Sequence, residues 1–192
     1  MTIEKPDGIT PSQTVGPFFA YCLTPGSYDF RAVFTTDLAH EAVEGERIRV
    51  EGTLVDGDDH PVPDAVIEIW QADGQGRYPR EAANAPFRGF GRAECGKDGR
   101  FAFTTVKPGP VAGPDGTDQA PHINVTVFAR GLLRHLFTRL YFEDEPANGG
   151  DPILELVPSE RRHTLIARKA GEGVYTFPIR LQGGEETVFF EA

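Results

Sequence analysis

The sequence feature that most constrains the fold is a series of short runs in which apolar and polar residues alternate, each closed by turn-forming residues. Alternation with a period of two is typical of half-buried strands, because successive side chains of a strand point to opposite faces of its sheet. The runs up to residue 142 are 47–55, 65–71, 91–95, 100–106, 122–130 and 136–142. Their spacing predicts an all-β fold, an antiparallel β-sandwich.

The turn residues support many short strands rather than long helices, since the chain has 22 glycines and 16 prolines. Lys97-Asp98-Gly99 lies between two of the runs, and Asp-Gly accepts the positive φ angles of a tight turn, so we expect a hairpin there. Residues 174–181 and 187–190 predict two more strands around Gly183-Gly184. Pro178 places the first of these two strands at a sheet edge or at a bulge.

One short helix is expected in the C-terminal half of the chain. Ser159 can cap its N-terminus, Leu165 and Ile166 would face inward, and Gly171 would end it. Residues 1–45 lack a period and predict an irregular N-terminal arm, while 46–192 form the sandwich. We find no repeat or linker, so residues 1–192 are expected to form a single domain.

The charge and the cysteines narrow the class of protein. A net charge of −10 disfavours nucleic-acid binding, which relies on Lys and Arg to neutralise phosphates. Cys22 and Cys95 are far apart and lack a metal-ligand spacing, which suggests reduced thiols, although one bridge between them stays open. We see no apolar signal core and no run near the ~20 apolar residues of a membrane helix, so we expect a cytoplasmic protein.

The run at 122–130 has one apolar face, which a core can bury at no cost, and one polar face, whose side chains call for a structural or functional explanation. The apolar face consists of Ile123, Val125, Val127 and Ala129. The other face carries His122, Asn124, Thr126, Phe128 and Arg130. A lone histidine is more often a hydrogen-bonded structural residue than a metal ligand, and that is our starting interpretation of each histidine in this chain.

Several short motifs together change that starting point. They are W-Q-A-D at 70–73, G-R-Y at 76–78, K-P-G at 107–109, H-I at 122–123, L-Y-F at 140–142 and E-T-V-F-F at 186–190. Through these motifs the chain resembles the intradiol ring-cleaving dioxygenases, from about Thr10 to the C-terminus. The resemblance implies a β-sandwich fold and a non-haem ferric iron held by two tyrosinates and two histidines, oxygen and imidazole donors that suit Fe(III).

The members that this chain resembles most pair two homologous chains, of which only one holds iron. Tyr78 and His122 match the first tyrosine and the first histidine of the iron-holding chain. Val111 stands at the second tyrosine and Asn124 at the second histidine, and Gln119 replaces an active-site arginine. Two remaining ligands should not retain ferric iron. The resemblance therefore implies a non-catalytic α chain without a metal of its own, whose β partner holds the Fe(III) in αβ protomers that assemble further. Below, Tyr78, Val111, His122 and Asn124 are called the relic pocket.

Arg130, at the other end of the 122–130 run, is expected to belong to a different site from His122. Arg130 lies eight residues beyond His122, which is about 26 Å at roughly 3.3 Å per residue, too far for one pocket. The resemblance implies a catalytic pocket at the junction of the two chains, where Thr14, Gly16, Pro17 and Arg130 would contact the substrate, 3,4-dihydroxybenzoate. A guanidinium suits such an anion because it offers forked donors and a fixed charge. Alternatively, Arg130 only pairs with an Asp or Glu at the interface between the two chains, and the arm only drapes over the sandwich.

Three hypotheses for function follow. The first is an enzyme subunit whose assembly uses O2 to cleave the catechol between its hydroxyl-bearing carbons, giving 3-carboxy-cis,cis-muconate. The second is an independent mononuclear metalloenzyme that uses Tyr78, His122 and further ligands. The third is a β-sandwich binding module with no enzymatic partner.

Overall fold

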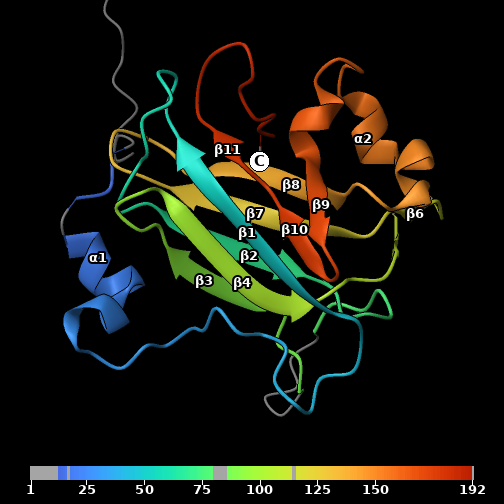
Figure 1. The fold of residues 1–192 in the computed structure, drawn as a ribbon, viewed down its shortest axis with the longest axis horizontal. Coiled ribbons are helices and arrows are strands. Elements are labelled where there is room, and N and C mark those ends of the chain that lie inside the picture. The colour runs from blue at the N-terminus through green and yellow to red at the C-terminus, as the bar shows by residue number, and fades with distance from the viewer. Residues whose placement is uncertain (1–12, 17, 80–85, 114–115, 192) are drawn as a thin grey trace, which may run out of the picture.

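The computed structural model describes residues 13–16, 18–79, 86–113 and 116–191. Nine of its strands form one nearly closed β-sheet folded into two layers, two more form a small separate sheet, and the few helices are short (Figure 1). No helix in this described part is long and apolar enough to cross a membrane. The strands are β1 Arg47–Val55, β2 Val66–Gln71, β3 Phe90–Glu94, β4 Arg100–Val106, β5 Val111–Ala112, β6 Asp118–Gln119, β7 His122–Phe128, β8 Leu136–Phe142, β9 Ile166–Gly171, β10 Val174–Thr176 and β11 Ile179–Arg180.

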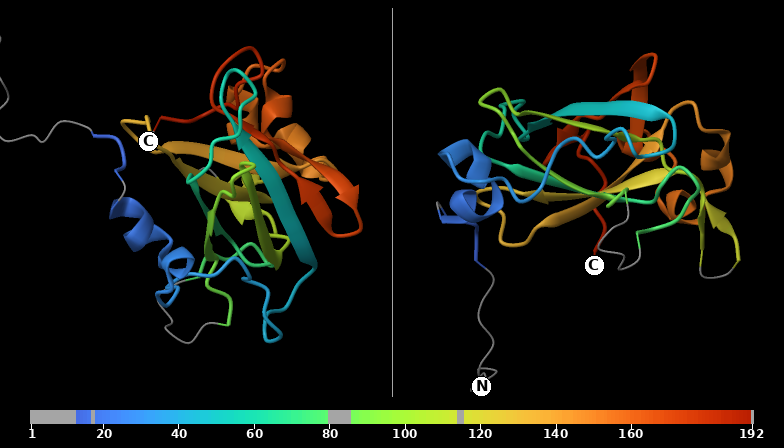
Figure 2. Two further views of the ribbon diagram at one scale, coloured as in Figure 1. Left: turned by 60° about the vertical axis from the view of Figure 1, so that its left-hand side comes forward. Right: turned by 90° about the horizontal axis from the view of Figure 1, so that it is seen from below.

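Two layers arise because β9 joins both halves of the sheet. The strand order is β11-β1-β10-β9-β8-β7-β2-β3, with β4 on the other side of β1, and β5 pairs only with β6. The start of β9 at Ile166 and Ala167 pairs with β8, while its later residues Arg168 and Lys169 pair with β10. Seen from below, β1 and β4 form one layer and β7 and β8 the other (Figure 2).

The predicted sandwich is confirmed, with two differences in pairing. Most pairs are antiparallel, but β1 runs parallel to β10 and β11, and β8 runs parallel to β9. The turn at Asp98-Gly99 exists, with Gly99 at φ +72°. However, β3 pairs with β2 and β4 pairs with β1, so the expected hairpin is wrong. The turn instead carries the chain from one layer to the other.

The helix expected after Ser159 is wrong. Residues Arg162–Leu165 form the 3-10 helix η3 and the following residues form β9, because Ile166 and Ala167 complete the sheet beside Tyr141 and Phe142. The α-helix of the C-terminal half is α2, Pro152–Leu156, preceded by the 3-10 helix η2, Pro146–Gly150. Its N-cap is Asp151, whose side chain accepts hydrogen bonds from two backbone N–H groups of the first turn.

Both ends of the chain depart from expectation in detail. The N-terminal arm contains α1, Phe18–Leu23, and the 3-10 helix η1, Pro25–Tyr28. The expected strand at 174–181 is interrupted next to Pro178 and gives β10 and β11, of which β11 ends the strand order. Residues 187–190 form no strand but a single bridge, from Phe190 to Phe137. Cys22 and Cys95 are free thiols, and burial raises the pKa of Cys95 to about 12, which keeps it unreactive.

The core lies between the layers and receives the apolar face of β7, as predicted: Ile123, Val125 and Val127 are at most 2% exposed. β7 ends at Phe128, so Arg130 belongs to the turn that follows it. A second, smaller cluster covers part of the outer face of β8 and brings α2 against it. Its buried members are Ala120, Tyr141, Leu154, Val157 and Leu165. This cover explains why His122, on the polar face of β7, is only 1% exposed.

Candidate functional site

Tyr78 is placed by a tight loop that follows β2. The Asp73 carboxylate holds this loop by accepting hydrogen bonds from the Arg77 backbone N–H at 3.0 Å and from the Arg77 guanidinium at 2.9 Å. Burial opposes ionisation of Asp73, but these hydrogen bonds outweigh it and lower the pKa of the carboxyl. Gly76 has φ +75°, and a Cβ there would lie 1.8 Å from the carbonyl oxygen of Pro110. Only glycine allows this close approach, which turns Tyr78 back towards the sheet.

The polar groups of the relic pocket bind one another. His122 Nδ1 lies 2.8 Å from the carbonyl oxygen of Ala120, which can only accept, so Nδ1 carries the proton and Nε2 is an acceptor. The Tyr78 hydroxyl lies 3.4 Å from that Nε2 and can donate to it. The Asn124 amide donates to the Tyr78 oxygen at 3.0 Å and more weakly to the Trp70 carbonyl oxygen at 3.3 Å. The Trp70 ring stacks on Tyr78 with centroids 5.6 Å apart.

Strand β8 adds a positive charge to this group. Arg139 is paired directly with Asn124, and Tyr141 with His122, so all four side chains lie on one face of the sheet. The Arg139 guanidinium donates to the Gln119 side-chain oxygen at 2.7 Å and approaches the Tyr141 hydroxyl at 3.5 Å. The amide that replaces the family's arginine therefore binds a guanidinium that arrives from the neighbouring strand.

Beneath Tyr141 lies the fully buried carboxylate of Asp151. It accepts hydrogen bonds from the Tyr141 hydroxyl at 3.0 Å, from the Ala120 backbone N–H at 2.8 Å, and from the N–H groups of Ile153 and Leu154. These four donors replace the water that the carboxylate loses on burial. Asp151 thus connects α2 to the segment that holds His122.

Burial sets the protonation of both rings in this region. It lowers the pKa of His122, and the nearby positive charge of Arg139 lowers it further, while the Ala120 carbonyl and Asp151 act in the opposite direction. Burial likewise raises the pKa of Tyr141 well above its ordinary value. His122 is therefore neutral, and Tyr141 is a phenol rather than a phenolate.

Val111 completes the relic pocket from the short β5–β6 pair, where it stands opposite Gln119. It lines, with Tyr78 and Phe87, a hollow of about 710 Å³. The four relic positions thus lie in the same region of the structure. However, Val111 has no atom that can bind a metal, and the Asn124 amide directs an N–H group at the Tyr78 oxygen. Such residues do not fit ferric iron, which needs anionic oxygen and imidazole ligands. Among the described residues, no group of three or more His, Cys, Asp or Glu side chains could hold a metal.

The far end of β7 is open to solvent. Arg130 is exposed and forms an ion pair with Asp64 at 3.0 Å, in which both side chains stay more than half exposed. The next residue, Gly131, donates its backbone N–H to the Thr14 hydroxyl at 2.7 Å. Two predicted site residues, Thr14 and Arg130, are therefore close together, and the turn that holds them is separated from His122 by the length of β7.

The remaining predicted residues of this end are only partly described. Gly16 is exposed, and a Cβ added there would meet nothing within 4 Å. Pro17 lies outside the described residues. The ion pair of Arg130 with Asp64 lies within this chain, at a solvent-exposed position. An exposed pair of this kind is worth about 0–1 kcal/mol, so it leaves Arg130 available to another anion.

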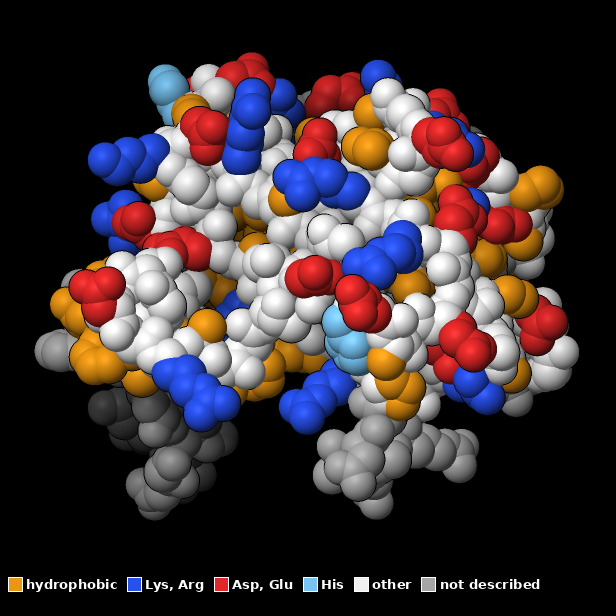
Figure 3. Space-filling model, turned by 60° about the horizontal axis from the view of Figure 1, so that its bottom comes forward, with side chains coloured by type: hydrophobic (Ala, Val, Ile, Leu, Met, Phe, Trp, Pro, Cys, Tyr) orange, Lys and Arg blue, Asp and Glu red, His pale blue; other side chains and the backbone are white. Residues whose placement is uncertain are grey.

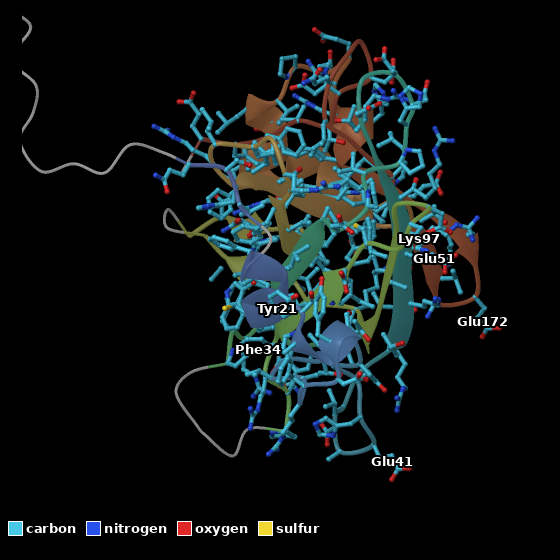
Figure 4. The ribbon with its side chains drawn as sticks, turned by 90° about the vertical axis from the view of Figure 1, so that its left-hand side faces the viewer. Tyr21, Phe34, Glu41, Glu51, Lys97 and Glu172 are labelled. Carbon is cyan, nitrogen blue, oxygen red and sulfur yellow. The ribbon has the colours of Figure 1, made fainter. Side chains whose placement is uncertain are left out.

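A surface rich in exposed aromatic groups follows the arm. The rings of Tyr21 and Tyr28 contact each other at a tilt of 44°, with centroids 4.5 Å apart, and Phe34 packs edge-on against Phe90 at 4.8 Å. Hydrophobic side chains gather on this side of the molecule (Figure 3), and Tyr21, a residue of α1, and Phe34 both lie on the side that faces the viewer in Figure 4. This aromatic surface, as it is called below, consists of Phe19, Tyr21, Tyr28, Phe30, Val33 and Phe34, which are 38–71% exposed.

Sequence reasoning missed Arg139, Asp151 and the aromatic surface. An available signal was the charge of Arg139 inside the otherwise uncharged run 136–142. Another was the pair of phenylalanines at 30 and 34 within a segment that carries no strand period.

Comparison with known proteins places the chain in a family. A family profile described as "Dioxygenase" matches residues 15–183. The chain belongs to the intradiol dioxygenase family. It is 48% identical to the protocatechuate 3,4-dioxygenase alpha chain of Burkholderia cepacia, over 95% of this chain and 96% of that one. It is 33% identical to the beta chain from the same organism, over 79% of this chain and 73% of the relative.

The solved structures agree with the predicted fold. The dioxygenase domain of a carbohydrate-binding fusion protein from Streptomyces sp. SirexAA-E superimposes with a TM-score of 0.62 at 25% identity, over 93% of this chain and 100% of that one. The β-sandwich expected from the intradiol dioxygenase resemblance is therefore confirmed.

Proposed function

We propose that this chain is the alpha subunit of a protocatechuate 3,4-dioxygenase. In the proposed assembly a homologous beta subunit binds the Fe(III), and together the chains cleave 3,4-dihydroxybenzoate with O2 to 3-carboxy-cis,cis-muconate. The observation that carries the proposal is the difference between 48% identity to an alpha chain and 33% identity to the beta chain of the same organism. The two free thiols accord with the cytoplasm as the site of action.

The relic pocket supports the division of labour between the chains. Tyr78 and His122 could each serve as a metal ligand, but they are within hydrogen-bond distance of each other. Val111 and Asn124 occupy the two positions where further ligands would be needed. Iron bound in the partner would supply the activation of the catechol towards O2. The catalytic task of this chain is then confined to binding and orienting the substrate and to assembly.

The open end of β7 is where we place the contact with substrate. Arg130 offers a fixed positive charge at the surface, and its only described ion-pair partner, Asp64, is weakly held because both groups are exposed. Thr14 fixes the turn through Gly131, so the arm and Arg130 present one continuous edge to a neighbouring chain. Gly16 leaves open space beside this edge. The contact of Pro17 with the substrate stays a prediction from the resemblance. A carboxylate of 3,4-dihydroxybenzoate matches the charge of Arg130.

We assign the aromatic surface as the part of this chain that contacts the beta subunit. Monomers rarely expose a contiguous group of large apolar side chains, and interface centres are enriched in Tyr and Phe. The surface is continuous with the arm, because Phe19 of α1 lines a shallow hollow with Gln13, Leu132 and His135 beside the turn after β7. One partner could therefore cover the aromatic surface and reach Arg130.

Reconstitution tests the proposed function. The chain and a paralogue that carries both tyrosines and both histidines would be produced separately, mixed, and assayed for ring cleavage by the loss of 3,4-dihydroxybenzoate and the uptake of O2. We expect activity to rise sharply on mixing and to be negligible with this chain alone. Full ring cleavage by the isolated chain would instead support an independent metalloenzyme. No effect on mixing, and no complex between the chains, would support a binding module.

A further inference from the structure

Trp70 stands out because it is the only large hydrophobic residue of the described strands that stays exposed. It lies on the outer face of β2, since its neighbours Ile69 and Gln71 are buried. The Tyr78 ring stacks on the indole with centroids 5.6 Å apart, yet Trp70 remains 38% exposed. Tryptophan is strongly enriched among the residues that carry the energy of protein–protein binding. A partly open indole on a sheet face therefore suggests a contact with another chain.

Trp70 is continuous with the aromatic surface. In the sheet it stands directly opposite Phe90 of β3, and side chains of such cross-strand pairs contact each other. Phe90 in turn packs against Phe34, which belongs to the aromatic surface, with ring centroids 4.8 Å apart. Aromatic rings thus form a series that leads from the aromatic surface to the relic pocket. Its members are Phe34, Phe90, Trp70 and Tyr78.

The charged groups beside this series do not oppose its burial. Glu68 and Arg92 form an ion pair in which their side chains are only 16% and 13% exposed, and Arg92 Cζ lies 4.5 Å from the centroid of the Phe34 ring. Because this pair has already lost most of its water, a partner that covers it removes little further hydration. On β1, by contrast, the paired side chains of Arg49 and Glu51 are 51% and 43% exposed. Interface centres are poor in such charges, so the apolar route leads across β3 and β2.

We propose that the beta subunit covers Trp70 as well, so that its contact runs from the aromatic surface across Phe90 to the rim of the relic pocket at Tyr78. The six residues of the aromatic surface are too few for a stable interface, which uses about 20–30 residues on each side. The contact must therefore extend beyond them, and the aromatic series gives its direction. This extension rests on the proposed function and adds an anchor residue, Trp70, to it.

The burial of this side chain can be observed directly, because Trp70 is the only tryptophan in the chain. The full-length chain would be produced with 5-fluorotryptophan, which gives a single ¹⁹F resonance. The unlabelled beta chain would then be titrated in, while analytical ultracentrifugation follows complex formation. The difference in ¹⁹F shift between H2O and D2O reports whether water reaches the ring. We expect the resonance to move as the complex forms, and the solvent difference to be lost in the complex.

Three other results would overturn the role of Trp70. An unchanged resonance and solvent difference in a sample that contains the complex would place Trp70 outside the interface and leave the proposed function standing. The absence of any complex would remove the proposed function as well. Loss of the solvent difference when the labelled chain is concentrated alone would assign this face to a second copy of the chain.

Substitutions at the same position measure the strength of the contact. Trp70→Ser should raise the Kd of the αβ complex on the order of 30-fold, and Trp70→Phe, which keeps an aromatic ring, should raise it less. Thermal unfolding shows whether each variant is folded. If Trp70→Ser is not, Trp70→Phe and the ¹⁹F titration decide the question. An unchanged Kd in folded Trp70→Ser would contradict the proposed anchor.

Discussion

Polar side chains lie at both ends of β7, but they are buried at one end and exposed to solvent at the other. At one end, His122 is 1% exposed, and its partners, including Tyr78 and Asn124, are satisfied within the chain. At the other end, Arg130 is exposed and shares only a weak surface ion pair with Asp64. A polar group that is fully satisfied inside the chain contributes to stability but has little left for a ligand. A polar group at an open edge contributes little to stability and remains free to bind.

The first prediction concerns the open end and its neighbouring aromatic surface, and has the largest expected effect. Tyr21→Ser together with Phe34→Ser removes two aromatic groups proposed to be buried by the beta subunit. Each such loss at the centre of an interface costs about 2 kcal/mol, so the Kd of the αβ complex should rise at least about 100-fold. Calorimetry or analytical ultracentrifugation would measure it.

The matched control for this pair is Leu156→Ser. Leu156 is 78% exposed but lies on α2, far from α1 (Figure 1), so its loss should leave the Kd within a factor of about two. An equal effect of both changes, or no effect of either, would contradict the assignment of the aromatic surface.

The second prediction compares the stability contributions of the two ends through one carboxylate from each. Asp151 accepts hydrogen bonds from four donor groups, and Asp151→Asn would place an N–H group where one of the accepting oxygens now lies. This change should lower the free energy of unfolding by about 3 kcal/mol. Asp64→Asn, at the exposed end, should change it by less than about 0.5 kcal/mol. Denaturant unfolding of both variants measures the difference, and similar losses would break the comparison.

The third prediction concerns catalysis by the assembled enzyme. Arg130→Ala should lower kcat/KM for 3,4-dihydroxybenzoate on the order of tenfold to 100-fold, because a charge-assisted contact contributes about 1.5–3 kcal/mol. Asp64→Asn is the control, since it removes the intrachain partner of Arg130 and leaves the guanidinium in place. Iron content should be unchanged in both. Unaltered kinetics in the alanine variant would remove Arg130 from the substrate site.

The fourth and smallest effect is a dependence of stability on pH at the closed end. Burial lowers the pKa of His122 in the folded chain, so the unfolded chain binds more protons and stability rises with pH. The cost appears as pH falls below the ordinary histidine pKa of ~6.5 and amounts to at most about 1.4 kcal/mol per pH unit. His122→Gln should flatten the slope of unfolding free energy between pH 7 and 5.5.

Local alternation was enough to predict the strands of the sandwich, but not their partners. The apolar face of β7 was correctly assigned because burial follows the period of two along one strand. The expected hairpin at Gly99 failed because a tight turn fixes the direction of the chain and not the layer that receives it. Likewise, the helix signals from Ser159 to Gly171 are local, whereas the pairing of Ile166 with Tyr141 is a contact across the fold that overrides them.

At the candidate site too, features local in the sequence could be predicted, whereas contacts across the fold could not. The resemblance identified the positions of Tyr78, Val111, His122 and Asn124. In the structure Tyr78 lies within hydrogen-bond distance of His122 and Asn124, and Val111 lines a hollow with Tyr78. Arg139 was missed because its importance depends on the register that sets it beside Asn124. A one-residue shift of that register would turn Arg139 to the other face of the sheet. The sequence did not predict the cover over this face, because α2 and its neighbours come from a later part of the chain.

The most direct test of the central claim is the iron content of this chain purified without a partner, compared with that of the αβ complex. We expect negligible iron and no tyrosinate-to-iron absorption band in the isolated chain, and about one iron per αβ pair in the complex. Stoichiometric iron with the charge-transfer band in the isolated chain would contradict the account.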